Sequence, residues 1–270
     1  MVRKSIVTLF VLGLGLVLLL TPLLAEARSL DDIIKSGVIR AGIETDIPPL
    51  GGFNDKNELV GFDVDFANKI AEMLGVKLEM VKILGTDRIP FVVSGKIDFS
   101  LGALTRNPAR AKVIDYTLPL HTESFAVLTL EGKPFKHWKD LNDANVTLIQ
   151  VRGTTPLDFI KENLPKAKTL LLDSNADIVR ALSQGRGDAI IDVLDFFAIH
   201  MSHYNVKWRV LETPIEVYYC GVGVAKGNYT LRDWLNVAIF ELHKTGWVDE
   251  AWKKWLGGPM VFGVQASPYF

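Results

Sequence analysis

Cysteine is almost absent from this 270-residue chain, which contains a single one, Cys220. An internal disulfide is therefore impossible, and a zinc site built from cysteines is excluded. An excess of one charge is also lacking, because 30 Lys and Arg residues face 31 Asp and Glu residues. A nucleic-acid-binding surface requires a clustered basic excess, so we expect no nucleic-acid partner. The hydrophobic content of 49% indicates a packed globular protein.

Long apolar runs are confined to the amino terminus. A short basic start precedes the apolar segment 6–20, and Ala25-Glu26-Ala27 follows as a small-x-small site. This is the pattern of a secretory signal peptide, so we expect residues 1–27 to be removed on export. The alternative is an uncleaved membrane anchor, because the apolar run is almost long enough to span a bilayer. No cysteine lies near the cleavage site, which excludes a lipid-anchored form. An exported chain with one thiol predicts a periplasmic location.

No Ser/Gly-rich linker divides the rest of the chain, and strand-like and helix-like segments alternate instead. The clearest helix is 62–74, where Phe66, Ile70 and Leu74 share one face and Gly75 ends the pattern. The other expected elements of this half are strands at 38–43, 77–84 and 97–101 and a short helix after Thr86. This β-α-β-α-β order predicts a mostly parallel sheet covered by helices.

The second half of the chain repeats this plan. Its expected elements are strands at 146–151, 169–172 and 189–193 and helices at 156–163 and 174–184. The segment 94–98 (SGKID) matches the segment 184–188 (QGRGD), each of which ends a helix and opens a strand with Asp. We therefore predict two similar α/β lobes that face a cleft, and a single larger sheet is the alternative. In such sheets, ligands bind at loops beyond the carboxyl ends of the strands.

Those loops contain groups that suit a small anion or zwitterion. Arg110 follows the small-residue segment 102–105, and Asn107-Pro108 predicts that it lies in the first turn of a helix. An arginine fork can hold a carboxylate with two charge-assisted hydrogen bonds. Gly153-Thr154-Thr155 opens another helix, whose free amides favour an anion. Each signal alone is weak, because such a sequence is commonly only a helix cap.

Taken together and in order, the motifs resemble those of a known family. The chain is similar to type II periplasmic solute-binding proteins of the polar amino acid class, which are the capture components of ABC importers. The resemblance covers roughly 30–257 and is specific for the family rather than for the ligand. It rests on LVGFDVD (59–65), SGKID (94–98), LTRNPARA (104–111), VRGTT (151–155), GRGDA (185–189) and KWLG (254–257).

The resemblance implies a two-lobed type II fold, with a mostly parallel, helix-flanked sheet in each lobe. Lobe 1 is expected at 28–121 plus 223–270, and lobe 2 is expected to be inserted at 122–222. Two strands, near 121–128 and 218–224, are expected to form the hinge. The implied function is capture of a small amino acid or related carboxylate by hinge closure, followed by delivery to an ABC membrane permease. A monomer without a cofactor is expected.

The same resemblance implies roles for individual residues. Arg110 resembles the arginine that clamps the ligand α-carboxylate, with the Thr105 hydroxyl as its partner. Gly102 and Ala103 offer backbone groups at the same place. Thr154-Thr155 resembles the contact that the second lobe makes with that carboxylate.

Four acidic or basic residues are candidates for contact with the rest of the ligand. Glu44 lies where many members keep an acid that reads a ligand amine or side chain. Arg88 matches a position that can meet a side-chain carboxylate, although the two residues could instead pair with each other. The acid that normally pairs with the α-ammonium is replaced by Val193, with Asp192 one residue early and Asp195 two residues late. A one-residue shift on a strand turns a side chain to the opposite face.

Other functions are weighed against this one. Some proteins that look like this family are cyclohexadienyl dehydratases, which act on prephenate or arogenate with a general acid in the cleft. The segment 188–200 contains no Glu, Glu44 is the one candidate acid in the cleft loops, and no catalytic triad is apparent, so we expect no enzyme. His200 and His203 lack an obvious third ligand, so we expect no metal site. A protein that presents its ligand to a chemoreceptor is the remaining alternative.

Overall fold

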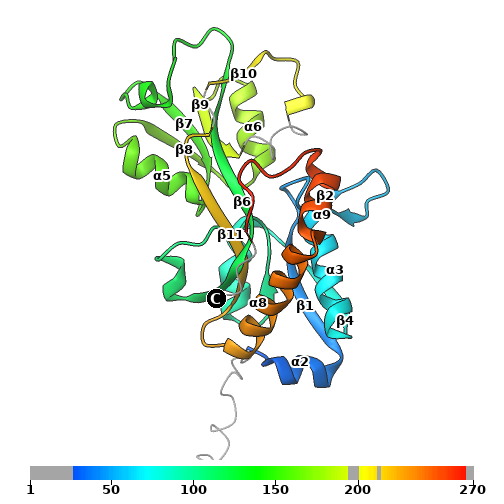
Figure 1. Cartoon of the computed structure of the whole chain (residues 1–270). Coiled ribbons are helices and arrows are strands. Elements are labelled where there is room, and N and C mark those ends of the chain that lie inside the picture. The colour runs from blue at the N-terminus through cyan, green and yellow to red at the C-terminus, as the bar shows by residue number, and fades with distance from the viewer. Residues whose placement is uncertain (1–26, 194–200, 212–213, 266–270) are drawn as a thin grey trace, which may run out of the picture.

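The computed structural model describes residues 27–193, 201–211 and 214–265. The predicted signal peptide therefore lies, except for Ala27, outside the described residues, and so does Asp195. Across these ranges, none of the helices has the length and apolar character needed to cross a membrane. The chain forms two α/β lobes joined by long strands (Figure 1).

Lobe 1 is built on three parallel strands in the order β4-β1-β5. Helix α3 forms where the sequence predicts it, because Phe62, Phe66 and Ile70 are completely buried on one face. Gly75 ends it in a left-handed conformation at φ 72°. The helices and strands of this lobe are α2 (Leu30–Ser36), β1 (Val38–Glu44), β2 (Gly52–Phe53), β3 (Leu59–Val60), α3 (Phe62–Leu74), β4 (Lys77–Ile83), α4 (Arg88–Val93), β5 (Phe99–Ser100), α8 (Tyr229–Lys244) and α9 (Trp247–Leu256).

Lobe 2 has the same parallel arrangement, with strand β7 next to β8 on one side and β9 on the other. Helices α5 and α6 bury different apolar sets: Phe159 of α5 contacts Phe125 and Trp138, whereas Val179 and Leu182 of α6 pack with Ile149. The elements of this lobe are β7 (Thr147–Val151), α5 (Thr155–Asn163), β8 (Lys168–Leu172), α6 (Asn175–Ser183), β9 (Ala189–Val193) and β10 (Trp208–Val210).

Two antiparallel strands, β6 (Ile114–Leu130) and β11 (Val217–Ala225), connect the lobes (Figure 1). The first part of β6 pairs with β11, and its second part pairs with β9 across Phe125–Thr129. The hydrogen-bonded path therefore runs without a break through both lobes, in the order β4-β1-β5-β11-β6-β9-β7-β8. The chain forms the predicted two lobes, and because both lobes contain part of β6, their strands also belong to one continuous sheet. The residue boundaries of the lobes stay a prediction.

The predicted repeat has a structural counterpart in each lobe. Asp98, just before β5, accepts a hydrogen bond at 2.7 Å from the backbone N–H of Arg40 in the neighbouring strand. Asp188, just before β9, accepts one at 2.8 Å from the backbone N–H of Thr147. A basic side chain neutralises each carboxylate, with Arg40 at 2.8 Å from Asp98 and Lys133 at 2.6 Å from Asp188. The repeated Asp thus fixes the start of one strand against its neighbour in both lobes.

Candidate functional site

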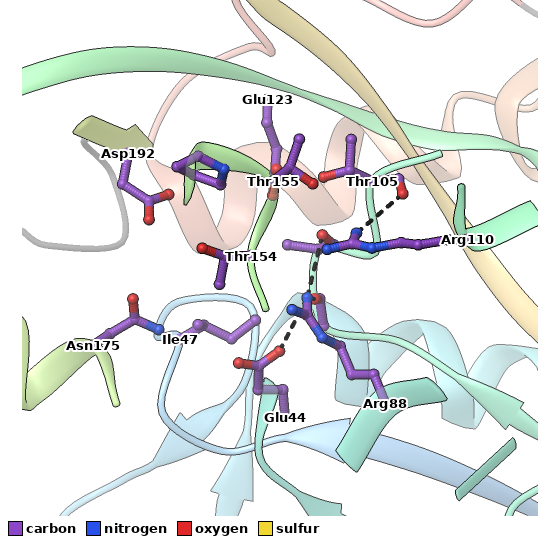
Figure 2. Close-up of a pocket in the computed structure, with 13 residues that line it drawn as sticks. Glu44, Ile47, Arg88, Thr105, Arg110, Glu123, Thr154, Thr155, Asn175 and Asp192 are labelled. Atoms are coloured by element: carbon purple, nitrogen blue, oxygen red, sulfur yellow. Dashed lines mark hydrogen bonds and ion pairs between the residues drawn. The ribbon is translucent and has the colours of Figure 1, made fainter. Parts of the chain in front are cut away.

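A cavity lies where the carboxyl ends of the strands of both lobes meet (Figure 2). Nine of the ten residues predicted to bind a ligand line it, and the tenth, Asp195, is outside the described residues. Ile47, Glu123, Pro156 and Asn175 line it as well. The complete lining is Glu44, Ile47, Arg88, Gly102, Ala103, Thr105, Arg110, Glu123, Thr154, Thr155, Pro156, Asn175 and Asp192.

Arg110 is held by the loop that follows β5. Its backbone N–H donates to Asn107 Oδ1 at 2.8 Å, and its Nη1 donates to the Thr105 carbonyl at 3.2 Å. The Tyr116 hydroxyl donates to the same carbonyl at 3.0 Å. The expected helix is only the three-residue 3-10 turn Arg110–Lys112, because β6 starts almost immediately afterwards. The turn nevertheless directs the guanidinium into the cavity.

Gly102 gives this loop its close approach to β1. Its φ of 94° lies in the left-handed region, and a Cβ there would be 2.5 Å from Glu44 Oε2. Any other residue would be strained and would collide with Glu44. The glycine therefore allows the loop and the acid to occupy the same side of the cavity.

Glu44 and Arg88 form an ion pair at the base of the cavity. Arg88 Nη1 lies 3.4 Å from Glu44 Oε2, and both side chains are buried. Arg88 also donates from Nε to the Gly85 carbonyl at 2.9 Å and from Nη1 to the Gly102 carbonyl. Burial raises the pKa of the Glu44 carboxyl to about 8, although the Arg88 charge opposes that rise. The pairing that the sequence left open is therefore present.

The lobe 2 wall contains the start of helix α5. The Thr154 hydroxyl donates to the Val151 carbonyl at 2.9 Å and does not cap the helix. Thr155 occupies the first helical position, and its buried hydroxyl has no hydrogen-bond partner among the described residues. The first amides of α5 are thus without a side-chain cap. Uncapped amides and the helix dipole together favour an anion.

Asp192 occupies the cavity wall, whereas Val193 is 5% exposed and belongs to the apolar core. Asp192 Oδ1 accepts a hydrogen bond from the Val193 N–H at 2.8 Å. Burial raises the pKa of the Asp192 carboxyl to about 7. The one-residue shift therefore leaves a carboxyl group in the cavity and places the apolar residue inside the fold.

Hydrogen bonds cross the cleft at two places. Arg110 Nη2 in lobe 1 donates to the Gly153 carbonyl in lobe 2 at 3.0 Å. The Asn175 N–H at the start of α6 donates to Asp46 Oδ2 at 3.2 Å. The structure is therefore a closed form, in which each lobe supplies part of the cavity wall.

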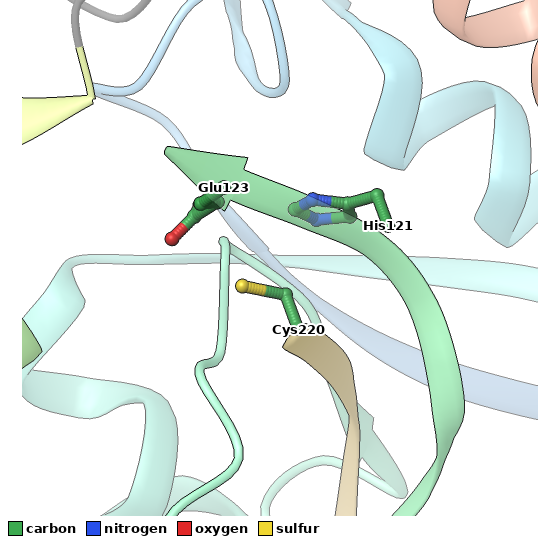
Figure 3. Close-up of side chains that lie close together, drawn as sticks. All are labelled: His121, Glu123 and Cys220. Carbon is green, nitrogen blue, oxygen red and sulfur yellow. The ribbon is translucent and has the colours of Figure 1, made fainter. Parts of the chain in front are cut away.

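Glu123 is the main residue that the sequence reasoning missed. It lies on β6, beside the buried groups His121 and Cys220, and the potential ligand atoms of the three lie within 4.8 Å of one another (Figure 3). Burial raises the pKa of the Glu123 carboxyl to about 8 and lowers that of His121 to about 4. At neutral pH, the three groups are uncharged, so we interpret them as a neutral polar cluster in the hinge. The available signal was an acidic residue within the segment 121–128, which the sequence predicts to be part of the hinge.

Residues 39–258 match the family described as bacterial extracellular solute-binding proteins, family 3. The chain belongs to this family. Among its relatives, the glutamine-binding protein GlnH of Bacillus subtilis is 28% identical, with 80% of each chain covered. The cyclohexadienyl dehydratase of Pseudomonas aeruginosa is 27% identical over 62% of this chain and 63% of the enzyme.

Solved structures agree on the fold of this family member. The L-cysteine receptor of Neisseria gonorrhoeae superposes with a TM-score of 0.78 at 30% identity, covering 85% of this chain and 94% of the receptor. A binding component of an ABC transporter from Wolinella succinogenes, complexed with lysine, gives 0.75 at 27% identity, covering 82% and 96%. The names of these relatives give chemically different ligands. Similarity therefore assigns the family, and the ligand has to be inferred from the residues of the site.

Proposed function

We propose that the protein captures a small amino acid or related carboxylate outside the cytoplasm and delivers it to an ABC membrane permease. The observation that carries this proposal is Arg110, whose guanidinium lines the cavity and bonds across it to Gly153. The uncapped amides of α5 lie on the opposite wall. A carboxylate between them gains charge-assisted hydrogen bonds from both lobes, which links binding to closure.

The binding order follows from this division of the site. The carboxylate first meets Arg110 and the Thr105 loop, which one lobe supplies without help from the other. Closure then adds Thr154 and Thr155, and Asp192 provides an acceptor for the α-ammonium group. Asp195 is a second proposed ammonium partner. A permease that recognises only the closed form then receives only loaded protein.

The cellular setting is also part of the proposal. Residues 1–27 have the pattern of a secretory signal peptide, and no cysteine near the cleavage site offers a lipid anchor. We therefore place a monomeric, unanchored protein in the periplasm. Its membership of an extracellular binding family supports this location.

A thermal-shift screen tests the function directly. The exported protein is unfolded and refolded to remove bound ligand, then heated with each of the twenty amino acids and with small carboxylates. A ligand that binds only the folded form raises the melting temperature by mass action. A concentration-dependent rise in melting temperature with an amino acid supports the proposal. If no amino acid and no carboxylate raises the melting temperature, the proposal is contradicted.

A cyclohexadienyl dehydratase is the second candidate, because buried carboxyl groups with raised pKa values line the cavity. A carboxyl group that keeps its proton at neutral pH can act as a general acid. The Pseudomonas relative supports this reading at 27% identity. Incubation with prephenate, followed by detection of phenylpyruvate, decides the matter: turnover supports the enzyme, and unchanged prephenate excludes this activity.

A further inference from the structure

The cavity wall contains buried oxygen atoms that lack a hydrogen-bond partner. Among the described residues, the buried wall atoms without a hydrogen-bond partner are Glu44 Oε2, which has only its ion pair with Arg88, Glu123 Oε1 and Thr155 Oγ1. Two of the three are carboxyl oxygens, which accept hydrogen bonds from a cationic group once the carboxyl is ionised. N–H groups of a ligand can therefore satisfy this wall.

The basic groups of the cavity already donate to the protein. Arg88 directs Nε and Nη1 at the backbone carbonyls of Gly85 and Gly102. Arg110 directs Nη1 and Nη2 at the carbonyls of Thr105 and Gly153. Neither guanidinium is hydrogen-bonded to Glu123 in these contacts, so the free acceptor of Glu123 depends on the ligand.

The charges of the lining lead to the same conclusion. Three carboxyl groups, Glu44, Glu123 and Asp192, face two guanidinium groups. Glu44 is paired with Arg88 at 3.4 Å, and Arg110 is the proposed partner of the ligand carboxylate. Glu123 and Asp192 are then left without a cation. The single α-ammonium of a neutral amino acid can neutralise only one of them.

Glu123 is enclosed rather than solvated, with 6% of the residue exposed. The titratable groups that act on it are Asp192 from β9, Cys220 from β11, Glu44 from β1 and Arg88 from α4, with His121 on its own strand. Only Arg88 among them is positively charged at neutral pH, and that charge is shared with Glu44. Without a cation the buried carboxyl keeps its proton, and an incoming cation favours the ionised form in its place.

We propose that the ligand is an amino acid with a cationic side chain, and that Glu123 is a binding residue for one of its two cationic groups. The inference rests on the proposed function and names the ligand class for the same cavity. Asp192 receives the other cationic group, and Arg110 receives the carboxylate. Glu123 and Asp192 reach the cavity from different strands, β6 and β9, so they offer two separate positions.

Matched ligand pairs test this inference by calorimetry on the refolded, ligand-free protein. Arginine is compared with its uncharged analogue citrulline, and lysine with norleucine; glutamine, glutamate and cysteine complete the panel. We expect at least one cationic ligand to bind roughly 30-fold more tightly than its uncharged analogue. Tightest binding of glutamine, glutamate or cysteine overturns the inference and leaves the proposed function intact. If no amino acid binds, the inference fails, and if no small carboxylate binds either, the proposed function fails with it.

The Glu123→Gln variant tests whether Glu123 binds a cationic group of the ligand, and Glu131→Gln is the matched control. Glu131 is an exposed residue just after β6, paired with Lys207 at 3.2 Å. We expect Glu123→Gln to reduce the preference for the cationic ligand roughly tenfold, and Glu131→Gln to leave it unchanged. A preference that survives in Glu123→Gln contradicts the role of Glu123.

A measurement on the wild-type chain avoids any folding defect of the variant. Burial keeps the Glu123 carboxyl protonated near neutral pH, and a cation beside it displaces the proton. Calorimetry in buffers with different ionisation enthalpies counts the protons released on binding. The cationic ligand is expected to release roughly one proton more than its uncharged analogue. Equal release by both ligands contradicts the proposal.

Discussion

Arg110 Nη2 donates a hydrogen bond to the Gly153 carbonyl across 3.0 Å, so one guanidinium touches both walls of the cleft. The same side chain holds its own loop through the Thr105 carbonyl. A ligand carboxylate that binds Arg110 is therefore placed next to both lobes at once. This geometry ties the energy of ligand binding to the energy of closure.

The second cross-cleft hydrogen bond predicts a mild effect on affinity. Asp46→Ala removes the acceptor of the Asn175 N–H. Because a net hydrogen bond contributes about 1 kcal/mol, ligand affinity should fall roughly fivefold with little change in the ligand-free melting temperature. Calorimetry measures the affinity, and Asp55→Ala, at an exposed turn, is the control. Equal affinities in the two variants would show that this contact does not stabilise closure.

The repeated Asp predicts unequal losses of stability in the two lobes. The Asp98 side chain is completely buried and contacts both Arg28 and Arg40, whereas that of Asp188 is 21% exposed and contacts Lys133. Breaking a buried ion pair costs about 3 kcal/mol or more, and an exposed pair is worth about 1 kcal/mol or less. Urea unfolding of Asp98→Asn should therefore show the larger loss. An equal or larger loss in Asp188→Asn is the contrary result.

Gly102 is predicted to tolerate no side chain. In Gly102→Ala, the new Cβ meets Glu44 Oε2 at 2.5 Å and Glu44 Cβ at 2.7 Å, at a φ of 94°. Displacement of Glu44 and of the loop should weaken ligand binding at least roughly tenfold, because a distorted site loses several contacts. Gly132→Ala is the control, with a φ of 88° and no heavy atom within 4 Å of the new Cβ. Calorimetry that finds the two variants alike would refute the steric explanation.

The buried carboxyl groups predict how stability depends on pH. Folding raises the pKa of Glu44 and Glu123 to about 8 and that of Asp63 and Asp192 to about 7. Above its pKa in the unfolded chain, each group therefore holds more proton in the folded state than in the unfolded state. Raising the pH then favours unfolding until the folded pKa is passed.

The window between pH 6.5 and about 8 isolates these acids, because the lowered pKa values of His121 and His243 act in the opposite direction only below about 6.5. The ligand-free protein should therefore lose stability across this window. Glu123→Gln should lose less, since it lacks one of the titrating groups, by up to roughly 1.4 kcal/mol per pH unit. Urea midpoints of both proteins at each pH provide the measurement. Parallel curves would mean that Glu123 does not titrate in this range.

The spacing of apolar residues and the residues that start or end helices predicted most of the helices and strands. Helix α3 has the predicted bounds, 62–74, because its apolar spacing and its terminal glycine are both local signals. The strand predicted at 97–101 is shorter, Phe99–Ser100, since only these residues find ladder partners in β1 and β11. Strand ends depend on neighbouring strands, which a single sequence does not specify.

The candidate site was predictable where it follows strands and was not predictable in the hinge. Arg110 and Thr105 lie in a loop that succeeds a strand, so topology alone places them at the cleft. Glu123 lies within β6, and its facing depends on the register with β11, where it pairs with Tyr218. Asn175 was not predicted, because Ser174-Asn175 carries only the signal of a helix start. The role of Asp195 stays a prediction.

The central claim, that Arg110 binds the carboxylate of an amino acid, is tested most directly by calorimetry on three proteins. Wild type, Arg110→Ala and Arg106→Ala are titrated with the amino acid that the thermal screen selects. Arg106 is in the same loop but outside the cavity lining, so it controls for loss of charge. Arg110→Ala should lose roughly 3 kcal/mol of binding free energy, because the ligand carboxylate then lies in the closed cleft without its cation. Arg106→Ala should bind as wild type does; full affinity in Arg110→Ala would contradict the account.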